Sequence, residues 1–440
     1  MASQATPKRT ASGWLDGVRS WANETMIAGR PLIWYVTGWR FALIALLISV
    51  ILPFIPYGAY SNIQALVVAM TSVWVYVMLA LGLNVVVGYA GLLDLGYVAF
   101  FVIGSYTFAA GTFGFLHNWS NDGFFAVPTF PLIMLLPVGA ILAGLGGVLL
   151  GAPTLRLRGD YLAIVTLGFG EIVPIVFQNV PTFYGNIGMS AVPPAPITFL
   201  GLTINFQDPL NNAPFYFLAL GVTVLIIFGV LALRDSSVGR AWVAIREDET
   251  AAEASGVNLT RTKLLAFGLG AFVGGIGGVV NTAFVPAVLP ANFNFNVSIT
   301  VLIMIVLGGI GSVPGVIIGA IILRLIDAYL LGLINDPIHQ SVLVAPANAP
   351  LHFLVNVDFN VMKYLIYGIV LILMIVLRPQ GIIPDARRKR ELKGIGAAPE
   401  DMSAIGMLAI EESGGDLATG DSLDQTEYVG EGSDAQGREG

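Results

Sequence analysis

Long apolar stretches recur along this 440-residue sequence, and they constrain its fold more than any other feature. A helix needs about 20 apolar residues to cross the hydrocarbon core of a bilayer. Soluble proteins carry about 25% charged residues, whereas this chain has 11%. The sequence therefore predicts an all-α, polytopic membrane protein with about ten transmembrane helices. The expected spans are 41–57, 63–88, 97–115, 131–152, 161–180, 214–233, 264–285, 297–310, 315–334 and 361–377.

The basic residues predict how these spans are oriented, because cytoplasmic loops are enriched in lysine and arginine. Of the 21 basic residues, only Arg324 and Lys363 fall within spans, and the other 19 (21 − 2) fall on one side of the membrane. We therefore expect both termini in the cytoplasm. The five segments then expected outside contain no Lys or Arg, and they are 58–62, 116–130, 181–213, 286–296 and 335–360.

The C-terminal end of the chain differs in composition from the apolar body. Residues 394–440 hold eleven acidic residues and one arginine, a charge of −10, which leaves +3 for the rest of a chain whose net charge is −7. The tail has few large apolar residues and cannot bury enough surface to fold alone. We expect a cytoplasmic N-terminal segment at 1–40, a transmembrane domain at 41–385 and a disordered acidic cytoplasmic tail at 386–440.

The sequence lacks the residue patterns of several classes of enzyme. It contains no cysteine, which excludes thiolate metal sites and disulfide scaffolds, and no lysine follows a glycine, which excludes a Walker A phosphate loop. The three histidines, His117, His339 and His352, lie far apart in predicted outside loops. A net charge of −7 gives no basic footprint for nucleic acid. We expect a non-catalytic protein with no cofactor, no bound metal and no nucleic-acid partner.

Ionisable side chains inside spans are costly in hydrocarbon and therefore mark contacts with protein or water. Glu171 lies in the middle of the span 161–180, and Asp94 lies in the glycine-rich stretch 89–96, which is expected to break a helix near the inner face. Arg324 and Asp327 are three residues apart, so they share a helix face and are expected to pair. For each residue a structural hydrogen bond competes with a place on a pathway through the membrane, for which Glu171 is the leading candidate.

Glycines spaced every four residues predict smooth helix faces where another backbone can approach closely. These faces either pack statically or allow helices to slide past each other. The two sets are Gly270, Gly274 and Gly278, and Gly311, Gly315 and Gly319. The units 84–105 and 303–322, each a helix, a glycine-rich loop and a helix, look alike and suggest an internal repeat.

The longest loop on the basic side, 234–263, predicts two short helices. Asp235 and Ser236 offer an N-cap before a helix at 238–246, Asp248 and Glu249 open a second helix at 250–255, and a glycine closes it. Small alanines among charged residues suit docking into the groove of a partner protein; the alternative is a solvated connecting loop. The residues expected to form this docking element are Arg240, Arg246, Glu247, Asp248, Glu249, Ala251, Ala252, Glu253 and Gly256.

Several stretches of the chain, taken in order, resemble a known family. The matching stretches are 82–84, 87–97, 155–172, 239–256, 306–312 and 378–381, and they include Gly91-Leu92-Leu93-Asp94-Leu95-Gly96, Leu155-Arg156-Leu157-Arg158-Gly159-Asp160-Tyr161 and Arg378-Pro379-Gln380-Gly381. Over roughly residues 40–385 the chain is similar to the LivM-type permease subunit of branched-chain amino acid ABC importers.

The resemblance implies a transport function that fits the missing Walker A loop. A LivM-like permease pairs with a LivH-like second permease, two ATP-binding ABC subunits dock on the cytoplasmic face, and an extracytoplasmic binding protein delivers leucine, isoleucine or valine. The loop 234–263 then corresponds to the ATPase-coupling element, and Glu171, Asp94 and Asn84 become candidates for the substrate pathway. The resemblance also implies a bacterial or archaeal plasma (inner) membrane, with transport by alternating access.

The outer segments depart from the family pattern, and they leave two rival functions open. The chain reads Tyr184-Gly185-Asn186-Ile187-Gly188-Met189 where the family often has a Thr-Gly-Gly-Pro-Asn-Gly-like stretch, and Pro290-Ala291-Asn292-Phe293 where Pro-Glu-Ser-Phe is common. An ABC permease for urea or short amides fits these departures. A self-sufficient secondary transporter is the rival of another class, although it has no use for a docking element.

Overall fold

A computed structural model of the chain describes residues 26–27, 30–31, 60–112, 132–154, 159–180, 188–190, 197–199, 202–204, 212–285, 287–327, 359–378 and 380–383. The chain divides into two units, Met1–Asp385 and Ala386–Gly440, and every described residue lies in the first. The predicted first span 41–57, the predicted tail 386–440 and the three histidines lie outside the described residues.

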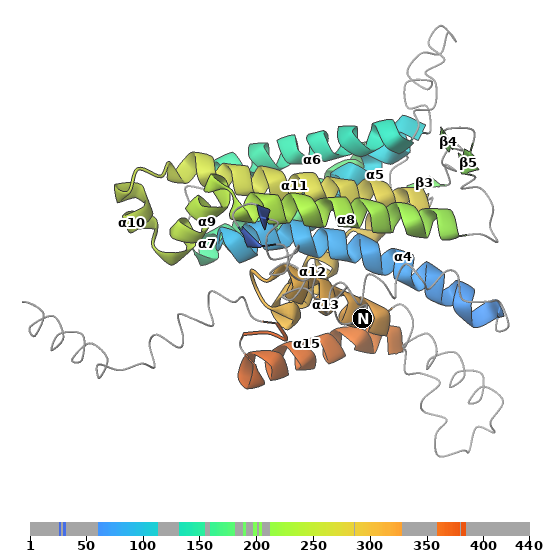
Figure 1. Cartoon of the computed structure of the whole chain (residues 1–440). Coiled ribbons are helices and arrows are strands. Elements are labelled where there is room, and N and C mark those ends of the chain that lie inside the picture. Colours follow the sequence, from blue (N-terminus) through green and yellow to red (C-terminus); the bar gives the residue numbers. More distant parts are fainter. Residues whose placement is uncertain are drawn as a thin grey trace, which may run out of the picture. The chain divides into compact units, whose positions relative to one another are not determined.

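The described part of the chain is mostly helical, as the sequence predicts (Figure 1). Its helices are α4 (Tyr60–Leu83), the π-helix η2 (Asn84–Tyr89), α5 (Val98–Thr112), α6 (Leu132–Thr154), α7 (Asp160–Asn179), α8 (Ala213–Asp235), α9 (Ser237–Glu247), α10 (Glu249–Ala254), α11 (Leu259–Phe284), the 3₁₀ helix η5 (Pro290–Asn292), α12 (Phe295–Gly308), α13 (Val313–Leu325) and α15 (Phe359–Leu377).

The strands in the described residues are all two or three residues long. Three antiparallel pairs form: β1 (Met26–Ile27) with β2 (Arg30–Pro31), β3 (Met189–Ser190) with β6 (Ala287–Val288), and β4 (Ile197–Phe199) with β5 (Leu202–Ile204). The β3–β6 pair joins the segment after α7 to the segment after α11, with Met189 opposite Val288. These short pairs connect loops and do not build a sheet core.

The apolar helices agree with the predicted spans. Six described stretches are long and apolar enough to cross a membrane: Leu66–Tyr89, Leu132–Thr154, Tyr161–Asn179, Ala213–Asp235, Leu259–Phe284 and Pro290–Gly308. Three shorter apolar helices are Val98–Thr112, Val313–Leu325 and Lys363–Leu377. These stretches overlap all the predicted spans except 41–57, which lies outside the described residues. The fold is therefore that of a helical, multi-pass membrane protein.

Helix α11 lies at the centre of the packed helices and contacts α4, α5 and α6 (Figure 1). Within a bilayer, helices associate mainly through close packing, so small residues at the contacts matter. A Cβ at Gly278 of α11 would lie 2.7 Å from the amide nitrogen of Ser105 in α5, and one at Gly270 would lie 3.0 Å from the carbonyl oxygen of Gly82 in α4. The predicted glycine face of α11 is therefore a packing surface.

The second predicted glycine face needs a correction. Gly315 and Gly319 lie on α13 and pack against the backbone of α12, as expected. Gly311 does not belong to that face, because it lies in the turn before α13, with a φ of +86°. The helix begins only after Ser312, whose side chain accepts a hydrogen bond from the amide of Gly315 at 3.3 Å.

Two glycine turns interrupt the helices and meet each other. In the first, η2 ends at Tyr89 and a non-helical segment leads to α5; in the second, residues 309–312 separate α12 from α13. The amide of Gly311 donates a hydrogen bond to Asn84 Oδ1 at 2.9 Å across 227 residues of sequence. The predicted helix–glycine loop–helix units are therefore real, and their turns are in direct contact.

The two basic residues inside spans share one acidic partner. Arg324 forms an ion pair with Asp327, as predicted, and Lys363 Nζ of α15 lies 3.2 Å from Asp327 Oδ1. Arg324 also donates to Ser72 Oγ of α4 and stacks over the ring of Tyr76, 4.3 Å from its centroid. A charge within a membrane needs such partners, and this cluster joins α4, α13 and α15.

Candidate functional site

The two short helices predicted in the loop 234–263 are present as α9 and α10. Ser236 caps α9 by accepting a hydrogen bond from the amide of Gly239 at 3.3 Å. Asp248 Oδ1 caps α10 by accepting from the amides of Thr250 at 2.7 Å and Ala251 at 3.1 Å. Gly256, with a φ of +86°, follows α10 in the left-handed conformation that closes helices. Local capping thus defines both helices, as expected from sequence.

Helices α9 and α10 are fastened to the start of α11. The indole of Trp242 on α9 is fully buried, and its Nε1 donates to the carbonyl oxygen of Thr262 at 2.8 Å. Lys263 is only 6% exposed, and its Nζ lies 2.6 Å from Glu249 Oε1 at the beginning of α10. Because an ion pair to a buried lysine and a buried indole fix these positions, α9 and α10 form a bracket that is packed against α11.

The exposed surface of α10 differs in one position from the sequence-based expectation. Ala251, Glu253 and Ala254 are exposed, and Gly256 is exposed beyond them. Ala252, which the sequence placed in the docking element, is 3% exposed, so its side chain packs into the chain itself and is not on the exposed surface of α10. A six-residue helix has one face toward its own protein, and Ala252 lies on that face.

Two arginines of α9 make different contacts. Arg240 Nη1 makes a local contact, because it donates to the carbonyl oxygen of Asp235, five residues earlier in the chain, at 3.1 Å. Arg246 Nη1 donates to the carbonyl oxygen of Gly88 at 2.5 Å, 158 residues away in sequence. Arg246 therefore connects the bracket to the first glycine turn. Glu247, next to Arg246 at the end of α9, is exposed.

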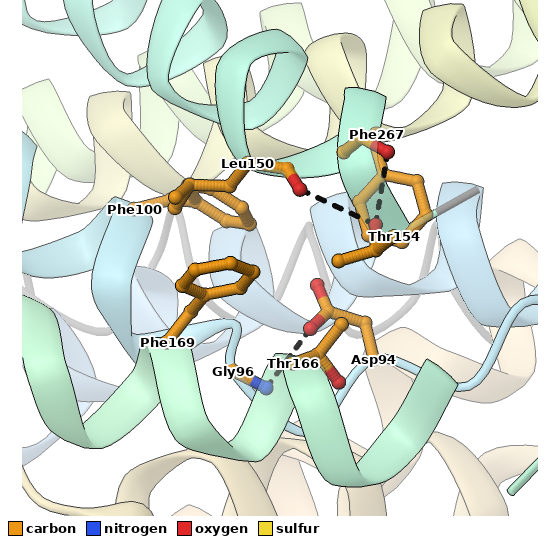
Figure 2. Close-up of a pocket in the computed structure, with 9 residues that line it drawn as sticks. Asp94, Gly96, Phe100, Leu150, Thr154, Thr166, Phe169 and Phe267 are labelled. Carbon is orange, nitrogen blue, oxygen red and sulfur yellow. Dashed lines mark hydrogen bonds between the residues drawn. The ribbon is translucent and has the colours of Figure 1, made fainter. Parts of the chain in front are cut away.

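Asp94 lies in the non-helical segment of the first glycine turn and is 2% exposed. Its Oδ1 accepts a hydrogen bond from the amide of Gly96 at 2.9 Å, whereas its Oδ2 is buried and makes no hydrogen bond within the described part of the chain. Figure 2 shows the second oxygen pointing into a small pocket. Its lining residues are Asp94, Gly96, Phe100, Leu150, Gly151, Thr154, Thr166, Phe169 and Phe267.

Thr166 and the aromatic side chains of this cavity were not singled out by the sequence analysis. Thr166 Oγ1 accepts a hydrogen bond from the amide of Leu95 at 3.1 Å, which fixes the segment that carries Asp94 against α7. Phe100, Phe169 and Phe267 surround the carboxylate from three helices (Figure 2). A neutral hydroxyl and phenyl rings inside apolar helices give no signal that separates a cavity wall from ordinary packing.

The three pathway candidates do not form one site. Asn84 is fully buried; its Oδ1 accepts a hydrogen bond from the amide of Gly311, and its Nδ2 makes no hydrogen bond within the described part of the chain. Glu171 is not among the residues that line the Asp94 cavity. It is exposed on α7, one turn after Gly168, where a Cβ would meet no atom within 4 Å. The two carboxylates thus lie in different environments: Asp94 is buried and Glu171 is exposed.

Comparison with known proteins identifies the family. The model of the family described as "branched-chain amino acid transport system / permease component" matches residues 65–375. The LivM permease protein of the high-affinity branched-chain amino acid transport system of Escherichia coli K12 is 37% identical over 347 residues, which are 74% of this chain and 72% of that protein. A probable LivM protein of Methanocaldococcus jannaschii is 23% identical over 354 residues, 72% of this chain and 93% of that protein.

A shorter match links the chain to a second kind of permease. The LivH permease protein of E. coli K12 is 36% identical over 109 residues, which are 25% of this chain and 34% of that protein. No solved structure gave a significant match. The family match covers more than half of the chain, and the similarity to LivM extends over nearly three quarters of both sequences. The chain belongs to the family of branched-chain amino acid transport system permeases and is a LivM-type member of it.

Proposed function

We propose that the chain is the LivM-type permease subunit of an ATP-driven importer of leucine, isoleucine and valine. The observation that carries the proposal is the similarity to LivM over 74% of the chain, together with the packed bracket formed by α9 and α10. The proposed assembly contains a LivH-like second permease, two ATP-binding subunits and an extracytoplasmic binding protein. The chain itself has no Walker A loop, so ATP hydrolysis is assigned to the partner subunits.

The proposed topology has ten spans with both termini in the cytoplasm of a bacterial or archaeal cell. The charge distribution supports it, because every predicted outside segment is free of Lys and Arg. The ion pairs of Asp327 add further support, since they give both basic residues inside spans a local partner. In this topology α9 and α10 lie on the cytoplasmic face, where ATP-binding subunits dock.

The proposed docking surface on the bracket consists of the exposed residues of α10, which are Thr250, Ala251, Glu253 and Ala254. The small side chains of Ala251 and Ala254 leave room for a groove of the partner to close around the helix. The links from Trp242 of α9 to Thr262 and from Glu249 of α10 to Lys263, both on α11, let a movement of α10 act on the transmembrane core. A freely solvated loop would absorb such a movement.

The proposed pathway involves Glu171 and Asp94, with Asn84 holding the adjacent turns. Glu171 lies near the middle of a transmembrane helix and is uncovered by its own chain. A carboxylate at such a depth faces protein or water and not lipid. We propose that the LivH-like subunit covers this face of α7 and that the amino acid passes between the two permeases. Asp94 Oδ2 offers a hydrogen-bond acceptor nearer the inner end of the path.

The test is transport by the assembled complex in proteoliposomes. We expect uptake of labelled leucine that requires ATP, the binding protein and both permeases, with competition by isoleucine and valine. Competition by urea or acetamide instead of these amino acids would establish the rival amide function. Uptake by this chain alone, driven by an ion gradient, would contradict the proposal and establish a secondary transporter.

The docking surface has its own test. Ala254→Arg adds a long charged side chain to the exposed face of α10 and should reduce co-purification of the ATP-binding subunits about tenfold or more. Thr260→Arg is the control, because it adds the same side chain at an exposed position on the first turn of α11. Equal recovery of the ATP-binding subunits with both variants would remove α10 from the interface.

A further inference from the structure

One arginine of the bracket contacts both glycine turns. Arg246 Nη1 donates to the carbonyl oxygen of Gly88 at 2.5 Å, and the same nitrogen lies 3.3 Å from the position that a Cβ of Gly311 would occupy. The stem of Arg246 also lies against Gly91, where a Cβ would be 2.8 Å from Arg246 Cγ. Three glycines from two distant segments thus contact a single arginine that is otherwise exposed.

We call the contact among Arg246, Gly88, Gly91 and Gly311 the junction. It is tight because the backbones of the two turns meet without side chains between them. A Cβ at Gly88 would lie 2.9 Å from the amide nitrogen of Gly311, so no larger residue fits there without movement. Gly91 and Gly311 have φ values of +70° and +86°, a region that favours glycine. Asn84 Oδ1 ties the turns together by accepting from the amide of Gly311. A shift of either turn therefore displaces the other.

The hydrogen bond from Arg246 also gives a partner to a backbone carbonyl at the end of a helix. Gly88 lies in η2, the last turn of the helix that begins with α4, and carbonyls in a last turn lack partners within the helix. A guanidinium is a strong donor to such a carbonyl, and a positive charge is favoured at the negative end of a helix dipole. η2 is a π-helix, a form that is often found at functional sites.

We propose that Arg246 is a positioning residue that transmits movement of the α9–α10 bracket to the two glycine turns. The proposal rests on the proposed function, because the movement originates in the ATP-binding subunits docked on α10. When the bracket shifts, Arg246 displaces Gly88 and the turn at Gly311 together. The ends of α4 and α12 then move in concert, and the adjoining Asp94 segment moves with them. Arg246 thus acts through these backbones and does not touch the substrate.

The first test needs only the permease and measures hydrogen–deuterium exchange in lipid nanodiscs. Arg246→Ala should speed exchange about tenfold in peptides that cover 84–97 and 308–313, because a charge-assisted hydrogen bond is lost. Arg246→Lys keeps a charged donor and should restore part of the protection. Arg261→Ala is the control, since it removes another exposed arginine of the same loop. Equal exchange in Arg246→Ala and Arg261→Ala would overturn the junction.

The second test measures coupling in the complete transporter. Arg246→Ala should retain the ATP-binding subunits and hydrolyse ATP, but it should import about tenfold less amino acid for each ATP consumed. Arg246→Lys should recover part of the ratio. An unchanged ratio in Arg246→Ala would overturn the proposal, and loss of the ATP-binding subunits would do so too by assigning Arg246 to the docking surface. A wild-type chain that binds no ATP-binding subunit would refute the proposed function, while the exchange measurement would still decide the junction.

Discussion

Helices α6 and α7 follow each other in sequence, and both expose one face, but the two faces differ in kind. The most exposed large side chains of α6 are apolar and include Ile133, Leu145 and Leu149, which are 65%, 59% and 74% exposed. α7 exposes Ile164 and Ile172 in the same way, yet Glu171 lies among them. The difference is the basis for the proposal that lipid covers α6, whereas protein or water covers α7.

The inner faces of the two helices differ as well. α6 packs closely along α11, with glycines such as Gly139 and Gly147 in the contact. α7 has fewer close neighbours and touches the rest of the chain through the side of Thr166, Gly170 and Phe177. A helix that is weakly held by its own chain and carries a mid-span carboxylate is suited to an interface with another subunit.

The largest expected effect comes from placing a charge on the α6 face. Leu145→Asp should lower the amount of membrane-inserted protein about a hundredfold, because an aspartate at the centre of a lipid-facing helix costs about 3 kcal/mol. Ile172→Asp on α7 should cost less, since that face already accommodates Glu171. Membrane fractionation measures both variants, and equal losses would mean that the two faces share one environment.

A bulky apolar substitution should have the opposite pattern of effects: it should impair the α7 face and leave the α6 face unaffected. Gly168→Trp fills the open space beside Glu171 and should reduce recovery of the LivH-like permease about tenfold, because it blocks the proposed interface. Leu145→Trp on α6 should leave that recovery unchanged, since tryptophan is compatible with lipid. Affinity purification through a tag on this chain measures the recovered partner. If neither variant changed it, the second permease would have to bind elsewhere.

The smallest effect expected is that of Glu171→Gln, which keeps the shape of the side chain and removes its charge. Insertion and assembly should be as in the wild type, while the rate of leucine uptake should fall several-fold. Uptake at a series of leucine concentrations distinguishes a change in apparent affinity from a change in rate. Wild-type uptake would remove Glu171 from the pathway and reduce the contrast between α6 and α7 to packing alone.

The sequence predicts the local features of this fold well. The apolar spans follow from the length of uninterrupted hydrophobic runs, and α9 and α10 follow from capping residues such as Ser236 and Asp248, which act within three residues of themselves. The pairing of Arg324 with Asp327 follows from helical spacing. Each of these features depends on neighbours in the sequence, so the sequence is sufficient to find it.

The features that depend on distant neighbours could not be predicted. Nothing near Gly88 or Gly311 indicates that their turns meet, because glycines make the contact through backbone atoms that every residue has. The burial of Ala252 could not be predicted either, since an alanine suits the buried or the exposed face of a short helix. The cavity at Asp94 combines residues from α5, α6, α7 and α11, whose arrangement is set by packing.

The most direct test of the contrast between α6 and α7 uses the absence of cysteine from the natural sequence. Leu145→Cys and Gly168→Cys each introduce one site for a nitroxide spin label. In the assembled transporter, the label at 145 should collide frequently with oxygen, which concentrates in lipid, while the label at 168 should be shielded from oxygen. Removal of the second permease should expose the label at 168. Equal oxygen accessibility at both positions in the assembled transporter would contradict the assignment of α7 to a subunit interface.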